Sequence, residues 1–160
     1  SVVHNGEISS YDTNRRYIEQ FGYKCSLQTD TEVITYIIDY LLREKKLTPE
    51  EIAHVIAASF WTTIAEKSPE EREQETFLRR AFPDLLICGP FSVVFGFTGG
   101  LMALNDRLKL RSMVCAEKGD FAYIASEECA IRAIRPELDR IFAPAGGQPV
   151  IYRLKEGAAV

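Results

Sequence analysis

The chain has no strong excess of charge and no extended basic segment. Its 19 Lys and Arg residues against 23 Asp and Glu leave a net charge of −4 with both histidines neutral. A protein that coats nucleic acid usually needs a basic face, and a membrane span needs about 20 consecutive apolar residues. The sequence offers neither, and it does not open with the basic and then apolar segment of a secretory signal. We therefore expect a cytoplasmic protein with neither nucleic acid nor a membrane as partner.

Metal-binding residue types are scarce. The four cysteines are Cys25, Cys88, Cys115 and Cys129. None pairs as C-x-x-C, and neither His4 nor His54 lies at a zinc-finger spacing from any of them. Neither Gly99-Gly100 nor Gly146-Gly147 has the Lys-Ser/Thr of a phosphate-binding loop. We expect four reduced thiols, no metal and no cofactor.

The length and composition suit one globular domain over residues 1–160. Of the 160 residues, 46% are hydrophobic and 26% are charged, which are ordinary values for a folded domain. The first residues predict a short strand at Val2-Val3, a helix from about residue 12 to 21 and a strand over Tyr23–Leu27. The strongest pattern predicts a helix over Thr31–Lys45, whose aliphatic side chains repeat at helical spacing and need burial.

Two motifs mark the starts of further helices. Thr48-Pro49-Glu50-Glu51 and Ser68-Pro69-Glu70-Glu71 each place a capping residue before a proline, with Glu at the third helical position. They predict helices over 48–66 and 69–82, the second of which is highly charged. Such a run of charge is typical of a solvated face.

From residue 91 onward the pattern changes from helical to extended. Phe91–Phe97 and Leu101–Leu104 flank the tight turn Thr98-Gly99-Gly100, as in a β-hairpin. Further strands are predicted at 113–116, 121–125, 138–143 and 149–154, with a short helix at 127–134. Strands joined by tight turns pair antiparallel, and helices that precede the strands favour a layered α+β fold.

Two polar positions are candidates for chemistry. In Asn5-Gly6, a side-chain amide and a backbone N–H can point at one spot, as an oxyanion hole requires. Asn-Gly is also a very common tight-turn dipeptide, and the residues alone leave this alternative open. Asp30 either caps the helix that follows it or holds a substrate ammonium group, and the spacing does not decide between the two.

The order of two motifs resembles that of the class II glutamine amidotransferases. Val2-Val3-His4-Asn5-Gly6-Glu7-Ile8 is followed by Thr29-Asp30-Thr31-Glu32-Val33-Ile34, and in that family the motifs read V-V-H-N-G-x-I and S/T-D-T/S-E-V-I. Segments at 89–94, 105–111 and 125–127 also resemble the family pattern, so the likeness covers most of residues 2–154. Leu110-Arg111-Ser112 and the closing segment 146–152 resemble the glutaminase domain of glutamate synthases more than that of the sugar-phosphate enzymes.

The resemblance implies an N-terminal-nucleophile hydrolase fold, a four-layer αββα sandwich with antiparallel sheets, of which this chain is the C-terminal part. It implies that the Asn5 amide and the Gly6 N–H form an oxyanion hole and that Asp30 binds the α-ammonium group of the substrate glutamine. It also implies a cysteine nucleophile and a synthase domain or subunit that accepts the released ammonia. Residues 47–90 have no counterpart in the family pattern, so we predict a helical insertion or docking surface there.

The sequence departs from the family at the nucleophile. The family places its nucleophilic cysteine at the mature N-terminus, with an arginine for the substrate carboxylate, both well before the Asn-Gly motif. Ser1 is no substitute, because four residues of strand separate it from Asn5 by roughly 13 Å. We therefore expect an N-terminal nucleophile-bearing segment to complete the glutaminase, and we expect residues 1–160 alone to be inactive.

Two other interpretations remain. A non-catalytic, amidotransferase-like binding or regulatory subunit would also do without the cysteine and the arginine. An unrelated α+β structural domain with a chance Asn-Gly turn would place the strand at 2–4 away from the start of the helix at 31–45.

Overall fold

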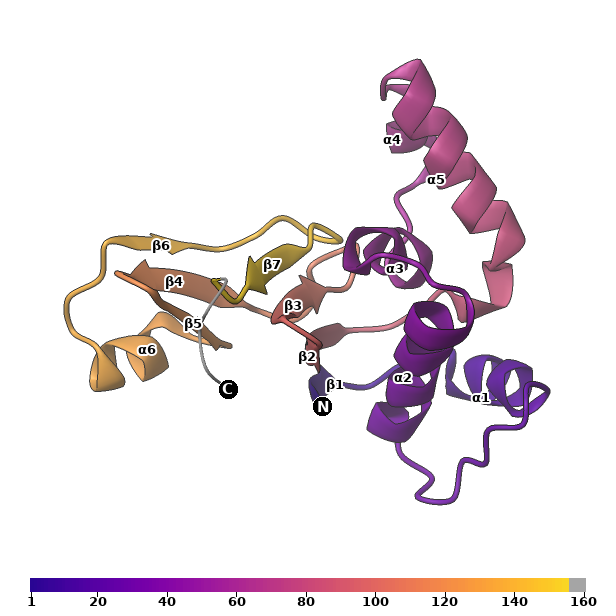
Figure 1. The fold of residues 1–160 in the computed structure, drawn as a ribbon, viewed down its shortest axis with the longest axis horizontal. Helices are drawn as coiled ribbons and strands as arrows, with labels where there is room; N and C mark the ends of the chain where they lie inside the picture. The colour runs from indigo at the N-terminus through magenta and orange to yellow at the C-terminus, as the bar shows by residue number, and fades with distance from the viewer. Residues whose placement is uncertain (156–160) are drawn as a thin grey trace.

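The computed structural model describes residues 1–155, which form an α+β fold with two antiparallel sheets (Figure 1). The strands are β1 (Val2–Gly6), β2 (Phe91–Phe97), β3 (Gly100–Asn105), β4 (Val114–Lys118), β5 (Phe121–Ala125), β6 (Arg140–Phe142) and β7 (Val150–Arg153). The helices are α1 (Tyr11–Glu19), α2 (Asp30–Asp39), α3 (Pro49–Ile56), α4 (Trp61–Ala65), α5 (Pro69–Ala81) and α6 (Glu128–Ile134). A π-helical turn (Tyr40–Glu44) extends α2, and a 3-10 turn (Pro83–Leu85) follows α5. The single domain predicted over 1–160 reaches beyond this, since 156–160 lie outside the described residues.

The larger sheet has the strand order β1-β2-β3-β7, so β1 is an edge strand. β1 pairs with β2 from Val2 opposite Phe95 to Gly6 opposite Phe91. Because side chains alternate between the two faces of a sheet, Phe91, Val93 and Phe95 share one face. All three are buried in the main core together with side chains of α1, α2 and α3. This apolar face explains why the strongly periodic helix α2 lies against the sheet.

The smaller sheet, with the order β5-β4-β6, packs on the opposite face of the larger one. Cys115, Ile124 and Phe142 lie level on its three strands. They form one apolar cluster with Val94 and Ala103 of the larger sheet. This contact between the sheets brings the end of β5 to the edge strand β1.

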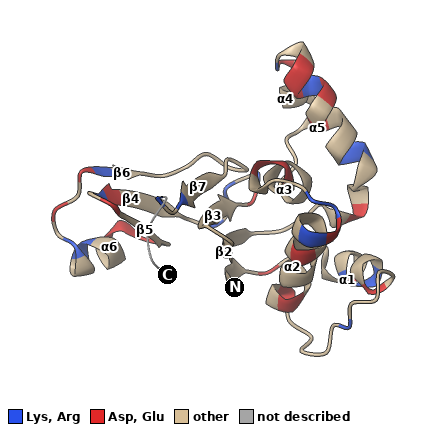
Figure 2. Ribbon diagram, in the orientation of Figure 1, with Lys and Arg blue, Asp and Glu red and all other residues tan. Residues whose placement is uncertain are grey.

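The two predicted capping boxes are present. The Thr48 side chain accepts from the Glu51 N–H at the start of α3, and the Ser68 side chain accepts from the Glu71 N–H at the start of α5. In both boxes the glutamate also accepts from the N-cap backbone. Figure 2 shows residues of both charge signs along α5, as the sequence predicted for this helix.

The single helix predicted over 48–66 is wrong. The chain leaves the helix after Ile56 and starts the separate helix α4 at Trp61. Two distant arginines stabilise the break, because Arg79 donates to the Ser59 carbonyl and Arg107 donates to the Ala58 carbonyl. These carbonyls therefore have partners without a continuing helix.

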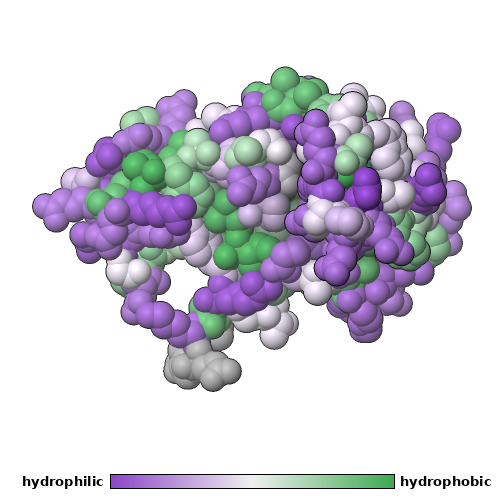
Figure 3. Space-filling view, turned by 90° about the horizontal axis from the view of Figure 1, so that it is seen from above, coloured by the Kyte–Doolittle hydropathy of each residue, from purple (hydrophilic) through white to green (hydrophobic). Residues whose placement is uncertain are grey.

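The segment 47–90 is helical, as predicted, and it contributes to the main core. Ile52 and Ile56 of α3, with Leu85 beyond α5, are fully buried. Whether these residues are an insertion relative to other proteins stays a prediction. Seen from above, hydrophobic residues reach the surface in separate patches among hydrophilic ones (Figure 3).

The strand predicted over Tyr23–Leu27 is also wrong. The Glu32 carboxylate accepts from the Ser26 N–H at 2.9 Å and from the Leu27 N–H at 2.7 Å. A strand would need these donors for its ladder, and here a side chain of the following helix takes them. Among residues 1–155, no helix is long and apolar enough to cross a membrane.

Candidate active site

The end of β1 presents an open row of backbone groups. Hydrogen bonds from the Gly96 N–H to the Ser1 carbonyl (2.8 Å) and from the Glu7 N–H to the Pro90 carbonyl (3.0 Å) bracket the β1–β2 ladder. Since bonding alternates along an antiparallel pair, the odd-numbered residues of β1 bond to β2. The Gly6 N–H therefore points to the other side, where the described part of the chain has no further strand.

Only glycine fits at position 6. Its φ is 149°, a conformation that L residues rarely adopt, and an added Cβ would lie 2.1 Å from the Pro90 carbonyl oxygen. A side chain here would displace either β1 or the start of β2. The sequence therefore needs Gly6 for the close approach of two backbones, independently of any chemistry.

Asn5 lies beside Gly6 and has an exposed side chain on the sheet face that turns toward the smaller sheet. Its Nδ2 donates to Ser126 Oγ at 3.1 Å. An amide nitrogen carries two N–H groups, so one N–H remains after this bond. The end of β1 thus offers two neutral donors from neighbouring residues, one from a side chain and one from the backbone.

Asp30 is joined to the same strand end. Its Oδ2 accepts from the Ile8 N–H at 2.8 Å. The Ser9 N–H bonds to the Cys88 carbonyl at 2.8 Å, so the alternation continues and the Ile8 N–H points to the same side as the Gly6 N–H. Two extended residues separate Gly6 from Ile8, a distance of about 7 Å. The Asp30 carboxylate therefore lies along the open edge that carries the Gly6 donor.

The cap of α2 is Thr29, not Asp30. The Thr29 side chain accepts from the Glu32 N–H at 3.3 Å. Of the two roles open to Asp30 from the sequence, helix capping is thus filled by its neighbour. The interpretation as an unrelated domain expected the strand at 2–4 to lie away from this helix, and the structure places the two together.

His4 ties β1 to the same helix from the buried face of the sheet. Its Nδ1 lies 3.4 Å from Thr31 Oγ1. Burial lowers the pKa of His4. The nearby Asp30 carboxylate raises this pKa by a smaller amount, and the Arg111 guanidinium lowers it further. The imidazole is therefore neutral at neutral pH and contributes packing and polarity rather than charge.

Three of the cysteines have raised pKa values. Burial raises the pKa of Cys115 to about 11 and also raises the pKa of Cys25. Cys129 is exposed, but its hydrogen bond to Glu127 raises the pKa of the thiol. Cys88 lies on the β2 side, where its carbonyl pairs with Ser9. A reactive cysteine needs a lowered pKa, and the pKa values of Cys25, Cys115 and Cys129 are shifted in the opposite direction.

Ser1 lies far along β1 from Asn5. Its carbonyl accepts from the Gly96 N–H, whereas Asn5 lies level with Ser92. Four residues of the ladder separate the two, a distance of roughly 13 Å. The geometry thus agrees with the separation expected from the sequence.

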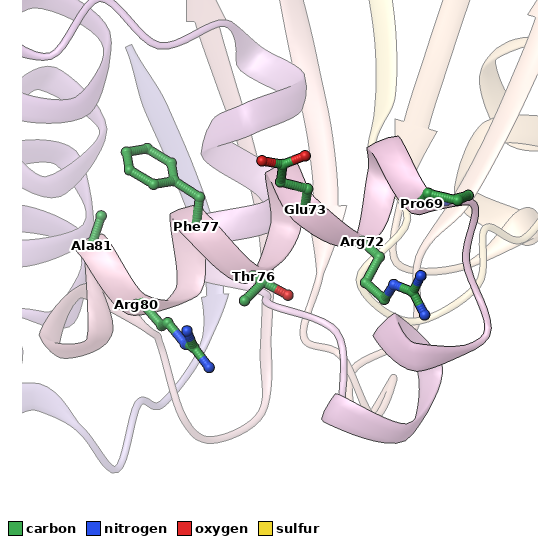
Figure 4. Close-up of a pocket in the computed structure, with 7 residues that line it drawn as sticks. All are labelled: Pro69, Arg72, Glu73, Thr76, Phe77, Arg80 and Ala81. Carbon is green, nitrogen blue, oxygen red and sulfur yellow. The ribbon is translucent and has the colours of Figure 1, made fainter.

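Other surface features lie away from this edge. A hollow of about 550 Å³ is lined only by residues of α5 (Figure 4). Within the described residues, no three His, Cys, Asp or Glu side chains come together in a way that would hold a metal ion. The groups found at the end of β1 are the Asn5 amide, backbone N–H groups and the Asp30 carboxylate.

Sequence comparison finds relatives that are considerably longer than this chain. No protein-family model matches the chain. It is 46% identical to an uncharacterized protein of Archaeoglobus fulgidus, over 97% of this chain and 41% of that protein. It is 30% identical to the isomerizing glutamine–fructose-6-phosphate aminotransferase of Vibrio vulnificus, over 82% of this chain and 21% of the enzyme. The chain thus spans less than half the length of either relative.

A solved structure agrees with this similarity. Glutamine phosphoribosylpyrophosphate amidotransferase from B. subtilis superimposes with a TM-score of 0.60 and 18% identity, over 95% of this chain and 26% of that one. The relatives whose function is named, such as the Vibrio vulnificus enzyme, are of the glutamine amidotransferase type. The predicted fold class, α+β with antiparallel sheets, is confirmed, and this amidotransferase shares the fold.

Sequence reasoning singled out Asn5, Gly6 and Asp30, and the structure brings all three to one end of β1. It missed the contact of Ser126 with Asn5. In the sequence, Ala125-Ser126-Glu127 stands out only because it resembles the family pattern. Asn5 and Ser126 are 121 positions apart, and no rule of sequence spacing links residues that far apart. Only the packing of the two sheets reveals that contact.

Proposed function

We propose that this chain is part of a class II glutamine amidotransferase and supplies the oxyanion hole and the substrate-ammonium site of its glutaminase. The observation that carries the proposal is the open edge of β1. There the Gly6 N–H and the Asn5 amide lie side by side in sequence, with the Asp30 carboxylate about two residues further along. The similarity to glutamine amidotransferases supports glutamine as the substrate.

Each group has a role in this reaction. Attack on the side-chain amide of glutamine turns its carbonyl oxygen into an oxyanion, which the Asn5 and Gly6 donors stabilise. The Asp30 carboxylate, with one oxygen held by the Ile8 N–H, binds the α-ammonium group and places the amide at the donors. Collapse of the tetrahedral intermediate releases ammonia and leaves an acyl-enzyme for water to hydrolyse.

The nucleophile comes from another segment in this proposal. The raised pKa values of three thiols and the distance of Ser1 from Asn5 support this assignment. The proposal therefore requires two partners, a segment that bears an N-terminal nucleophile and a synthase domain or subunit that accepts ammonia. Residues 1–160 alone are then inactive. The resemblance to glutamate synthases remains a prediction about the acceptor.

The test is the replacement of Asn5 by alanine in the complete natural polypeptide. Release of ammonia from glutamine is expected to fall about 10²–10³-fold, the loss typical of one oxyanion donor. Gln20→Ala, which removes an exposed amide at the end of α1, is the matched control and should leave turnover unchanged. Unchanged turnover in Asn5→Ala would refute the role of Asn5. Binding of glutamine without any turnover in the complete wild-type polypeptide would instead favour a regulatory subunit.

A further inference from the structure

One hydrogen bond joins the two sheets at the candidate oxyanion hole. Asn5 Nδ2 donates to Ser126 Oγ at 3.1 Å, across 121 residues of sequence. Asn5 belongs to the edge strand of the larger sheet, and Ser126 follows β5, the edge strand of the smaller one. The contact is therefore produced by the fold and not by local sequence.

The packing of the smaller sheet fixes the position of Ser126. Ser126 lies in the bend directly after β5, two residues beyond Ile124, which packs in the cluster between the sheets. Ile124 lies opposite Cys115, which is fully buried. Val94 of the larger sheet belongs to the same cluster, and Asn5 lies level with the residue two positions before it, Ser92. The Asn5–Ser126 hydrogen bond thus lies next to the apolar contact between the two sheets.

We propose that Ser126 is a positioning residue that holds the Asn5 amide in its productive orientation, an inference that rests on the proposed function. An Asn side chain on an exposed strand can rotate, and a half-turn about its last bond exchanges the N–H₂ and the carbonyl oxygen. The exchanged form would direct Oδ1 at the developing oxyanion and repel it. The bond to Ser126 Oγ uses one N–H of Nδ2, and the proposal assigns the second N–H of this group to the oxyanion. Ser126 acts through Asn5 and does not contact the substrate.

The experiment measures glutaminase kinetics of the complete natural polypeptide with Ser126→Ala. Loss of one orienting hydrogen bond is expected to lower kcat about tenfold. The KM for glutamine should stay within about twofold, because the oxyanion exists only in the transition state. Ser126→Thr retains the hydroxyl group and should restore most of kcat. Ser112→Ala, at an exposed serine before β4, is the matched control.

A double variant separates positioning from a general structural role. Once Asn5→Ala has removed the amide, Ser126→Ala should cost no further activity, because interacting residues are not additive. Additive losses, or a normal kcat in Ser126→Ala while Asn5→Ala is impaired, would overturn the role of Ser126 and leave the proposed function intact. An unaffected Asn5→Ala would overturn the proposed function itself, and this inference with it.

Discussion

Replacing Asp30 with asparagine tests the substrate-ammonium site most directly. The new side chain has the same shape, and its Oδ1 can still accept from the Ile8 N–H that Asp30 binds at 2.8 Å. The fold at the start of α2 should therefore persist, since the Thr29 cap is also untouched. What disappears is the negative charge at the open edge of β1.

The expected magnitude follows from the bond that is lost. A hydrogen bond between charged groups contributes about 1.5–3 kcal/mol, and each 1.4 kcal/mol changes an equilibrium about tenfold. The KM for glutamine should therefore rise about 10- to 150-fold in Asp30→Asn. Since the proposed role of Asp30 is to bind the ammonium group and not the reacting amide, kcat should change less than KM.

The assay compares two substrates in the complete natural polypeptide. Glutamine carries the ammonium group, whereas glutaramate has the same amide and carboxylate without it. Asp30→Asn should weaken the use of glutamine and leave that of glutaramate nearly unchanged. Asp12→Asn, at an exposed residue in the first turn of α1, is the control. An equal loss for both substrates, or no loss for either, would refute the assignment of Asp30.

Three further predictions concern stability and reactivity. Gly6→Ala should destabilise the fold by at least about 1–3 kcal/mol in chemical denaturation, because its Cβ would lie 2.1 Å from the Pro90 carbonyl oxygen at a φ of 149°. Burial lowers the pKa of His54 below its value in the unfolded chain, so the unfolded chain binds more protons. The free energy of unfolding should therefore fall as the pH drops through about 6.5. His54→Gln should reduce this loss. In the native protein, thiol reagents should modify the exposed Cys129 long before the buried Cys115, whose pKa is about 11.

Each of these predictions has an outcome that would contradict it, and the Gly6 prediction has a matched control. Gly22 also has a positive φ of 90°, but nothing lies within 4 Å of an added Cβ, so Gly22→Ala measures conformational strain without the steric clash. If the two alanine variants lose equal stability, the close approach to Pro90 is not the cause. A pH dependence that is unchanged in His54→Gln would remove that histidine from the explanation. Rapid labelling of Cys115 before unfolding would show that its surroundings open in the native state.

Local signals in the sequence predicted the elements whose causes are local. The Thr48 and Ser68 capping boxes formed as expected, since each involves residues three positions apart. The two wrong predictions have their causes in side chains outside the predicted element. Glu32 takes the N–H groups of the predicted strand at 23–27, and Arg79 and Arg107 hold carbonyls in the break after α3. Propensity and periodicity contain no information about such partners.

The candidate site also has some features that the sequence reveals and others that only the fold reveals. Asn5-Gly6 and Asp30 could be selected because their residue types carry the chemistry and their motifs are continuous. That the Gly6 N–H faces an open edge depends on β1 being the last strand of its sheet, which no pattern within 2–6 reveals. The support from Ser126 depends on how two sheets pack.

The open edge also constrains how the proposed reaction proceeds. A backbone N–H inside a ladder is already bonded and cannot stabilise an oxyanion, so Gly6 is useful only while no strand pairs with it there. β2 occupies the other side of β1 along its whole length. A glutamine amide bound by Gly6 and Asn5 must therefore lie beyond the edge, and its attacking group must approach from that side. The buried thiols of Cys25 and Cys115 lie within the packed interior, which is why the nucleophile is assigned to another segment.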